Sequence, residues 1–268
     1  RVARKRGEMA SIHWRCNPCE DREAYVSIGQ IGKLDLLVDR GVAEADLRII
    51  ISSVSPHFQA GFGGGYRLLV PGCAHVDTIR ELNRLGMEHP DRKYVGTEAE
   101  ANPMRSVIDA AGVMIDQRRG RSFAVQYLLD EGGLPTSIVT GEVIPTQRML
   151  AKQCAVACGI VTSAPADVLI TNAHPRNYDL CQSLKCIANT RWAVRPGGAI
   201  LCLTDTRVGL RDVLLPLWPI GPVWTRRALR LVGAEAACSL ARRLAPGLAR
   251  DAEPYFRWAA TVLHPNPN

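Results

Sequence analysis

The chain has 268 residues, of which 47% are hydrophobic, 22% charged and 6% aromatic. These proportions are those of a globular protein, and they exclude a collagen, a disulfide-stabilised miniprotein and a disordered tail. The formal net charge is +7, but much of the basic excess lies near the two ends of the chain. The charge therefore permits an anionic ligand and does not demand a nucleic-acid surface.

No segment predicts a membrane span, because the longest apolar stretch, residues 213–224, is interrupted by prolines. The chain begins at Arg1 with no apolar signal segment behind it, and we interpret it as a fragment or a trimmed product. Nine cysteines, an odd number scattered through apolar patterning, favour a reducing compartment over a disulfide framework. We therefore expect a cytoplasmic protein.

The segment 45–73 reads as a strand that leads into a loop. The apolar residues Leu47, Ile49, Ile50 and Ile51 predict a buried strand, and His57 and a cluster of glycines follow it. Apolar residues then recur at three-residue spacing with Asp77 in the first turn, which predicts a helix that ends near Gly86.

A second strand, loop and helix follow in the same order. Residues 165–171 predict a strand, 172–179 a loop and 180–192 a helix, and a further apolar strand is expected over 199–204. Two such units, far apart in the chain, predict an α/β fold with mostly parallel sheets flanked by helices.

We expect two domains, with a boundary between Gly141 and Gln147. Residues 1–145 would form an N-terminal α/β domain that is incomplete at its start, and residues 146–268 a C-terminal α/β domain. Beyond Arg211 the chain is rich in leucine, alanine and arginine at helical spacing, which predicts further helices.

The loop over residues 56–67 is the strongest candidate for a functional site, since ligands of α/β sheets bind beyond the carboxyl ends of strands. Four glycines would let backbone N–H groups approach an anion closely: Gly61, Gly63, Gly64 and Gly65. Arg67 would add a bidentate phosphate contact, and His57 could move a proton near neutral pH. A glycine-rich turn with a capping histidine is the alternative, because the spacing matches neither a dinucleotide fingerprint nor a Walker loop.

A second candidate site lies where the loop at residue 172 enters the next helix. Gln182 and Lys185 are three residues apart on one flank, where an amide and an ammonium could grip a carboxylate. A solvated helix face is the alternative reading. Cysteine spacing offers Cys16 with Cys19, but a single such pair predicts neither a zinc site nor a redox site.

Three stretches of the chain resemble the nickel-pincer-nucleotide lactate racemase family. They are residues 44–49 with the glycine loop 57–72, residues 101–105, and residues 166–198. The resemblance implies two α/β domains with the active site in the cleft between them. It also implies a reaction that inverts C2 of a 2-hydroxy acid: a histidine takes the hydroxyl proton while the C2 hydride passes to the nickel-pincer nucleotide, and the hydride returns on the other face.

On this resemblance His57 is one of the family's two acid/base histidines, and the other would precede Arg1. Gln182 and Lys185 fall where the family holds the substrate carboxylate. Two positions depart from the family, because Arg67 stands where a lysine carries the cofactor covalently and Asn83 where a histidine binds nickel. The resemblance thus implies a nucleotide held without a covalent bond, through Arg67 and the glycine backbone.

Three hypotheses follow. The first is a lactate-racemase-like isomerase that acts on a small-molecule 2-hydroxy acid. It would bind neither nucleic acid nor a membrane, and a homodimer is compatible with it. The second is a divergent, non-catalytic paralogue that binds a cofactor or anion. The third, a nucleotide-dependent oxidoreductase, ranks last because the glycine fingerprint with an acidic residue about twenty positions on is missing.

Overall fold

The structure is a computed structural model that describes residues 13–89, 92–97, 99–174, 177 and 180–205, together with single positions between 227 and 243. Most of the C-terminal region, for which the sequence predicts helices, lies outside the described residues. In the described part, no helix is long and apolar enough to cross a membrane.

The N-terminal elements are η3 (Arg22–Ala24), β1 (Tyr25–Ile31), β2 (Leu34–Asp39), α1 (Arg40–Ala43), β3 (Leu47–Ser53), β4 (Pro56–His57), β5 (Gly61–Phe62), η4 (Gly65–Leu68) and α2 (Val76–Leu85). They are followed by η5 (Ala99–Ala101), α3 (Pro103–Arg118), β6 (Arg121–Leu129), β7 (Pro135–Gly141), α4 (Val143–Cys158), β8 (Ala166–Asn172), α5 (Leu180–Thr190), η6 (Arg191–Ala193) and β9 (Val194–Leu203). The predicted α/β class is confirmed.

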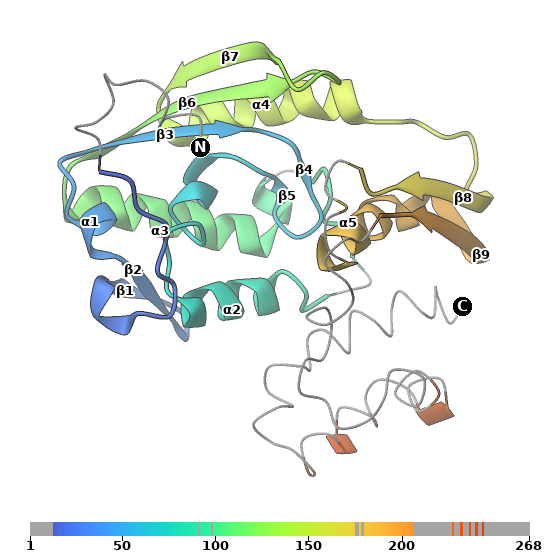
Figure 1. Cartoon of the computed structure of the whole chain (residues 1–268), viewed down its shortest axis with the longest axis horizontal. Coiled ribbons are helices and arrows are strands. Elements are labelled where there is room, and N and C mark those ends of the chain that lie inside the picture. The colour runs from blue at the N-terminus through green and yellow to red at the C-terminus, as the bar shows by residue number, and fades with distance from the viewer. Residues whose placement is uncertain are drawn as a thin grey trace.

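Two sheets contain parallel strands. The larger has the order β3-β6-β7, in which β3 and β6 run parallel and β6 and β7 antiparallel. The smaller pairs β8 with β9 in parallel, and α5 lies beside it (Figure 1). The pairs β1–β2 and β4–β5 are antiparallel ribbons. Parallel pairing is therefore confined to the two sheets whose strands lead into the expected loops.

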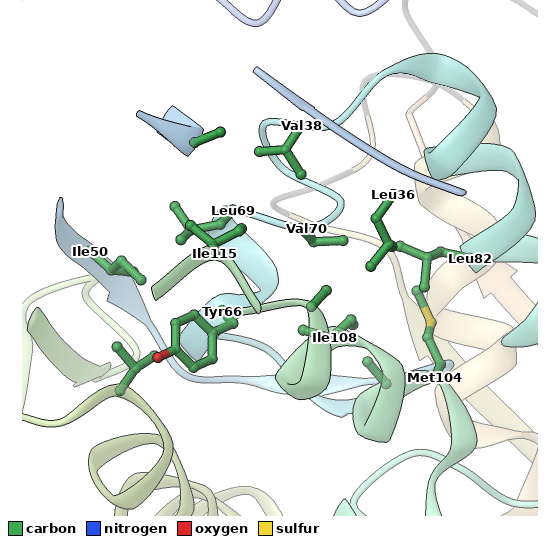
Figure 2. Packing of buried hydrophobic residues seen from close by; sticks show 14 of the residues in the cluster. Leu36, Val38, Ile50, Tyr66, Leu69, Val70, Leu82, Met104, Ile108 and Ile115 are labelled. Carbon is green, nitrogen blue, oxygen red and sulfur yellow. The ribbon is translucent and has the colours of Figure 1, made fainter. Parts of the chain in front are cut away.

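Helix α3 forms the centre of the core, where its apolar face meets the β1–β2 ribbon, η4 and the inner face of β3 (Figure 2). Ile108 and Ile115 are fully buried on it. Asn102 caps the helix by accepting from the N–H of Arg105, and Pro103 occupies the first turn, where its missing N–H costs nothing. Gly112 brings α3 against the ring of Tyr66, since a Cβ there would lie 2.0 Å from that ring.

The expectation that β3 is buried on both faces is wrong. Helices pack against one face of its sheet, so that Arg48, Ile50 and Ser52 are buried while the alternate residues Leu47 and Ile51 remain 61% and 64% exposed. A continuous apolar run does not distinguish a two-sided strand from a one-sided strand whose outer residues are also apolar. Among the described residues, nothing covers this outer face.

Helix α4 runs without a break through the position where the sequence predicts a domain boundary. It packs on β6 and β7, and Gln126 of β6 donates to the carbonyl of Val143 at its first turn. The division at residue 145 stays a prediction. The packing of α4 with the first sheet leads us to propose that the division falls in the connection 159–165, before β8.

Replacement of Gly112 by alanine is expected to destabilise the protein by about 1–3 kcal/mol, because the added methyl group forces α3 away from Tyr66. The gain in helix propensity of about 1 kcal/mol acts in the opposite direction. Urea unfolding measures the difference. The control is Val113→Ala at the neighbouring exposed position, and equal stability of the two variants would contradict the packing.

Candidate functional site

A cavity of about 580 Å³ lies between the loop that follows β3 and the helix α5. One wall comes from residues 51–58 and from the glycine loop. The opposite wall comes from the carboxyl end of β8 and from α5. The cavity brings together the side chains that the sequence singled out for chemistry: His57, Arg67, Gln182 and Lys185.

His57 is held at the start of a tight hairpin in which it pairs with Gly61. Its Nδ1 accepts from the backbone N–H groups of Gln59 and Ala60 at 3.3 and 3.1 Å. Arg67 Nη2 lies 2.9 Å from the other ring nitrogen, Nε2. Because a guanidinium has no acceptor, Arg67 is the donor in this contact and places its positive charge beside the imidazole.

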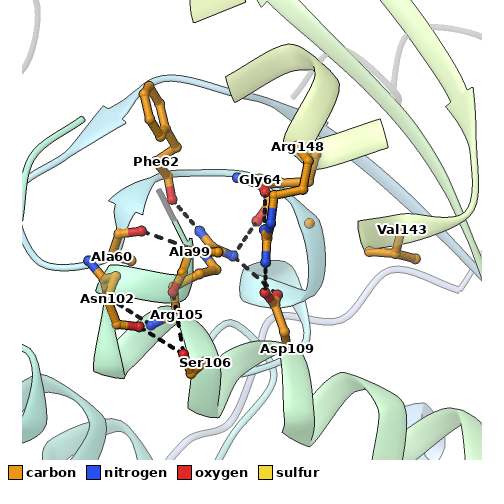
Figure 3. Close-up of polar contacts among 12 residues, drawn as sticks. Ala60, Phe62, Gly64, Ala99, Asn102, Arg105, Ser106, Asp109, Val143 and Arg148 are labelled. Carbon is orange, nitrogen blue, oxygen red and sulfur yellow. Dashed lines mark hydrogen bonds and ion pairs between the residues drawn. The ribbon is translucent and has the colours of Figure 1, made fainter. Parts of the chain in front are cut away.

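The glycine loop is fixed from behind by side chains that take up its carbonyl groups (Figure 3). Arg105 donates to the carbonyls of Ala60, Phe62 and Gly64. Two further carbonyls are taken up by other side chains, that of Gln59 by Asn102 and that of Gly63 by Gln147. The N–H groups of Gly63 and Gly65 are also bonded, to the carbonyl of Ser55 and to Gln126 Oε1, so that the loop is fixed in one conformation.

Arg105 is 1% exposed and supplies the positive charge beneath the loop. Burial lowers the pKa of its guanidinium to about 10, and the neighbouring carboxylate of Asp109 opposes this shift. The group is therefore protonated at neutral pH. Asp109 also accepts from Arg148 of α4, so that α3, α4 and the loop share one buried ionic cluster.

The predicted glycines divide into two groups. Gly63 and Gly64 line the cavity. Gly64 has φ +74°, and a Cβ there would meet Gln126 Oε1 at 2.6 Å. Gly61 and Gly65 do not line the cavity: a Cβ on Gly61 would meet the carbonyl of Thr97, and one on Gly65 the side chain of Gln147. Their role in this structure is to allow the close turns of the loop.

The opposite wall carries two donors next to each other. Lys185 Nζ donates to Gln182 Oε1 at 2.6 Å, which orients the amide and the ammonium within one turn of α5. A carboxylate is an acceptor only, so it complements an ammonium beside an amide nitrogen. Asn189, one turn further along α5, lines the same wall and has a buried Oδ1 with no hydrogen-bond partner.

Asn83, for which the resemblance implied the place of a nickel ligand, is not part of the cavity wall. It lies in α2, where its backbone carbonyl accepts from Gln59 at 3.1 Å. Among the described residues, no cluster of three or more histidine, cysteine or acidic side chains could hold a metal ion.

Sequence reasoning did not anticipate the supporting residues Arg105, Gln126 and Gln147. Arg105 belongs to a stretch noticed only for its resemblance. The one local signal was the asparagine and proline at 102–103, which mark the start of the helix that carries it.

The chain was compared with known proteins. A model of the lactate racemase N-terminal domain matches residues 7–94. The lactate racemase of Thermoanaerobacterium thermosaccharolyticum is 28% identical over 196 residues, which make up 71% of this chain and 43% of that protein. The lactate racemase of Lactiplantibacillus plantarum is 25% identical over 70% of this chain and 44% of its own length. Over most of its length, the chain is thus similar to lactate racemases. It spans less than half the length of these two curated relatives.

Two solved structures share the fold of this chain. The lactate racemase apoprotein of T. thermosaccharolyticum superposes with a TM-score of 0.70 at 21% identity, and the match covers 96% of this chain and 58% of that one. A protein from Thermotoga maritima gives a TM-score of 0.59 at 15% identity, with 91% and 61% of the two chains covered. At these identities the likeness concerns the fold alone.

Replacement of Arg105 by methionine is expected to lower the free energy of unfolding by about 3–5 kcal/mol, because three carbonyls of the glycine loop lose their buried donor. Urea unfolding measures the change. The control is Arg119→Met, which removes an arginine from an exposed ion pair with Asp46 and should leave stability unaltered. A similar loss in both variants would show that the Arg105 cluster has no special role.

Proposed function

We propose that the chain forms the binding pocket of a lactate-racemase-like isomerase that inverts C2 of a 2-hydroxy acid. One observation carries this proposal: His57 lines the same cavity as Gln182 and Lys185, although they are over a hundred residues apart in sequence. A 2-hydroxy acid needs two functions at once, since its carboxylate must be held while its hydroxyl exchanges a proton.

Different residues of the chain contact different groups of the substrate. Lys185 and the amide of Gln182 bind the carboxylate and so fix C2 relative to the opposite wall. His57 exchanges a proton with the hydroxyl group through Nε2, the nitrogen that faces Arg67 rather than the backbone. The bonds from Gln59 and Ala60 to Nδ1 keep the ring in one orientation.

The cavity wall fits an anionic nucleotide held without a covalent bond. Gly63 and Gly64 allow close approach, and Arg67 offers a guanidinium suited to a phosphate. It does not fit covalent attachment, because a guanidinium stays charged and is a poor nucleophile. Nor does Asn83 offer a nickel ligand at the cavity. When bound, a nickel-pincer nucleotide would supply the acceptor for the C2 hydride.

A second candidate function is anion binding without catalysis. It is favoured by the arginine at position 67 and by the location of Asn83 away from the cavity. The two functions differ in a measurable way, because a binding protein has affinity for a hydroxy acid but does not invert its configuration at C2.

Racemisation of L-lactate by the protein, produced in cells that make the nickel-pincer nucleotide, tests the first function. Chiral chromatography should detect D-lactate, and His57→Ala should lower the rate by about 10²–10⁴-fold, the contribution of general acid–base catalysis. His89→Ala, an exposed histidine after α2, serves as the control and should retain the rate. Lactate binding without any D-lactate would favour the anion-binding candidate.

Nickel content and intact mass test how the cofactor is held. The native protein should contain nickel when measured under native conditions but show the mass of the polypeptide alone after denaturation. Arg67→Lys introduces a primary amine and should allow a covalent adduct that survives denaturation. A covalent adduct in the native protein would contradict non-covalent binding. A native protein that contains neither an adduct nor nickel would favour the anion-binding candidate.

A further inference from the structure

Two thiols meet at the wall of the cavity. Cys186 of α5 lines it, directly after Lys185, and its Sγ lies 3.3 Å from the Sγ of Cys202 in β9. The cysteines that the structure describes are all free thiols, and these two are neither fully buried nor fully exposed. Neither has a part in the proposed racemase chemistry.

We propose that Cys186 and Cys202 form a reversible disulfide, a modification site that joins α5 to β9 at the edge of the binding pocket. The sulfur atoms must approach by little more than 1 Å to reach the S–S bond length of about 2.0 Å. Because the two residues lie on separate elements, a small shift of the helix against the strand closes this gap without breaking either one.

The environment assigns the two thiols different parts in the reaction. Burial, and then the hydrogen bond with Cys186, raises the pKa of the Cys202 thiol to about 11, so that Cys202 keeps its proton. Cys186 is the thiol in contact with the cavity, which admits a small oxidant. We therefore assign Cys186, the thiol that the oxidant reaches from the cavity, as the attacking group and Cys202 as the resolving thiol.

With hydrogen peroxide as oxidant the reaction balances in two steps. The thiolate of Cys186 attacks one oxygen and breaks the O–O bond, which leaves a sulfenic acid and releases hydroxide that takes up a proton to become water. Cys202 sulfur then attacks the Cys186 sulfur, the S–O bond breaks, and the thiol proton leaves with the hydroxyl group as a second water. Two thiols are oxidised and one peroxide is reduced.

A second pair of close thiols provides an internal control. Cys154 and Cys158 have sulfur atoms 3.8 Å apart, but both belong to α4 at positions i and i+4. The Cβ atoms of such a pair are about 5–6 Å apart, whereas a disulfide needs about 3.5–4.5 Å. Burial, and then Cys158, raises the pKa of the Cys154 thiol to about 12. A disulfide there would require α4 to unwind.

Peptide mapping after oxidation tests the proposal. The full chain is treated with hydrogen peroxide, its remaining thiols are alkylated, and trypsin cuts after Lys185 and Arg191, which places Cys186 and Cys202 on different peptides. The expected product is a linked pair of these peptides, lighter by two hydrogens than their sum and separated again by dithiothreitol. Cys154 and Cys158 should stay reduced during the peroxide treatment and so be alkylated in the same sample.

Cys202→Ser supplies the matched variant. It should abolish the linked pair and leave Cys186 as a sulfenic acid that dimedone traps. Three results would overturn the proposal: complete alkylation of Cys186 and Cys202 after peroxide treatment, linkage of Cys186 to another cysteine in the native chain, or equal oxidation of the α4 pair. None of these readouts depends on racemase activity, so failure here leaves the proposed function intact.

Discussion

Arg105 bonds to three carbonyls of one short loop from inside the core, and the geometry of the cavity depends on this contact. The backbone of a glycine-rich loop can approach a ligand closely, but ordering it costs more conformational entropy than ordering other residues. Without an anchor, such a loop would adopt many conformations. The guanidinium of Arg105 holds the loop in one conformation. The cost of burying its charge is offset by the ion pair with Asp109. The rigidity that the site requires thus resides in α3 and α4 rather than in the loop itself.

Positive charge is distributed on both sides of the cavity, which has a chemical consequence. Arg67 lies in one wall, beside His57 and the glycine loop, and Lys185 lies in the other. An anion with two separated charged groups, or two anions bound together, can satisfy both walls, whereas a single small anion satisfies one. A phosphate-bearing cofactor beside a carboxylate substrate meets this condition, which links the arrangement of charges to a two-component reaction.

The sequence predicted the elements around the site well because local signals coincide there. The strand before His57, the helix that begins near residue 76 and the helix that carries Lys185 all have clear periodicity or turn residues. The exposed outer face of β3 could not be predicted, since apolar residues on both faces of a strand look the same in sequence whether or not another layer covers them. The same limit applies to Cys202, whose neighbour Cys186 is set by tertiary packing, while sequence spacing suggested another pair, Cys16 with Cys19.

The residues that hold the site were harder to predict than those that line it. A lining residue such as His57 or Lys185 belongs to a chemical type that draws attention in a sequence. Arg105 draws none, because an arginine inside a helix usually extends into solvent, and only the close approach of the loop gives it three acceptors. The frame also holds the backbone at position 67, so a different side chain there would change the group that the wall offers to an anion without moving the wall itself.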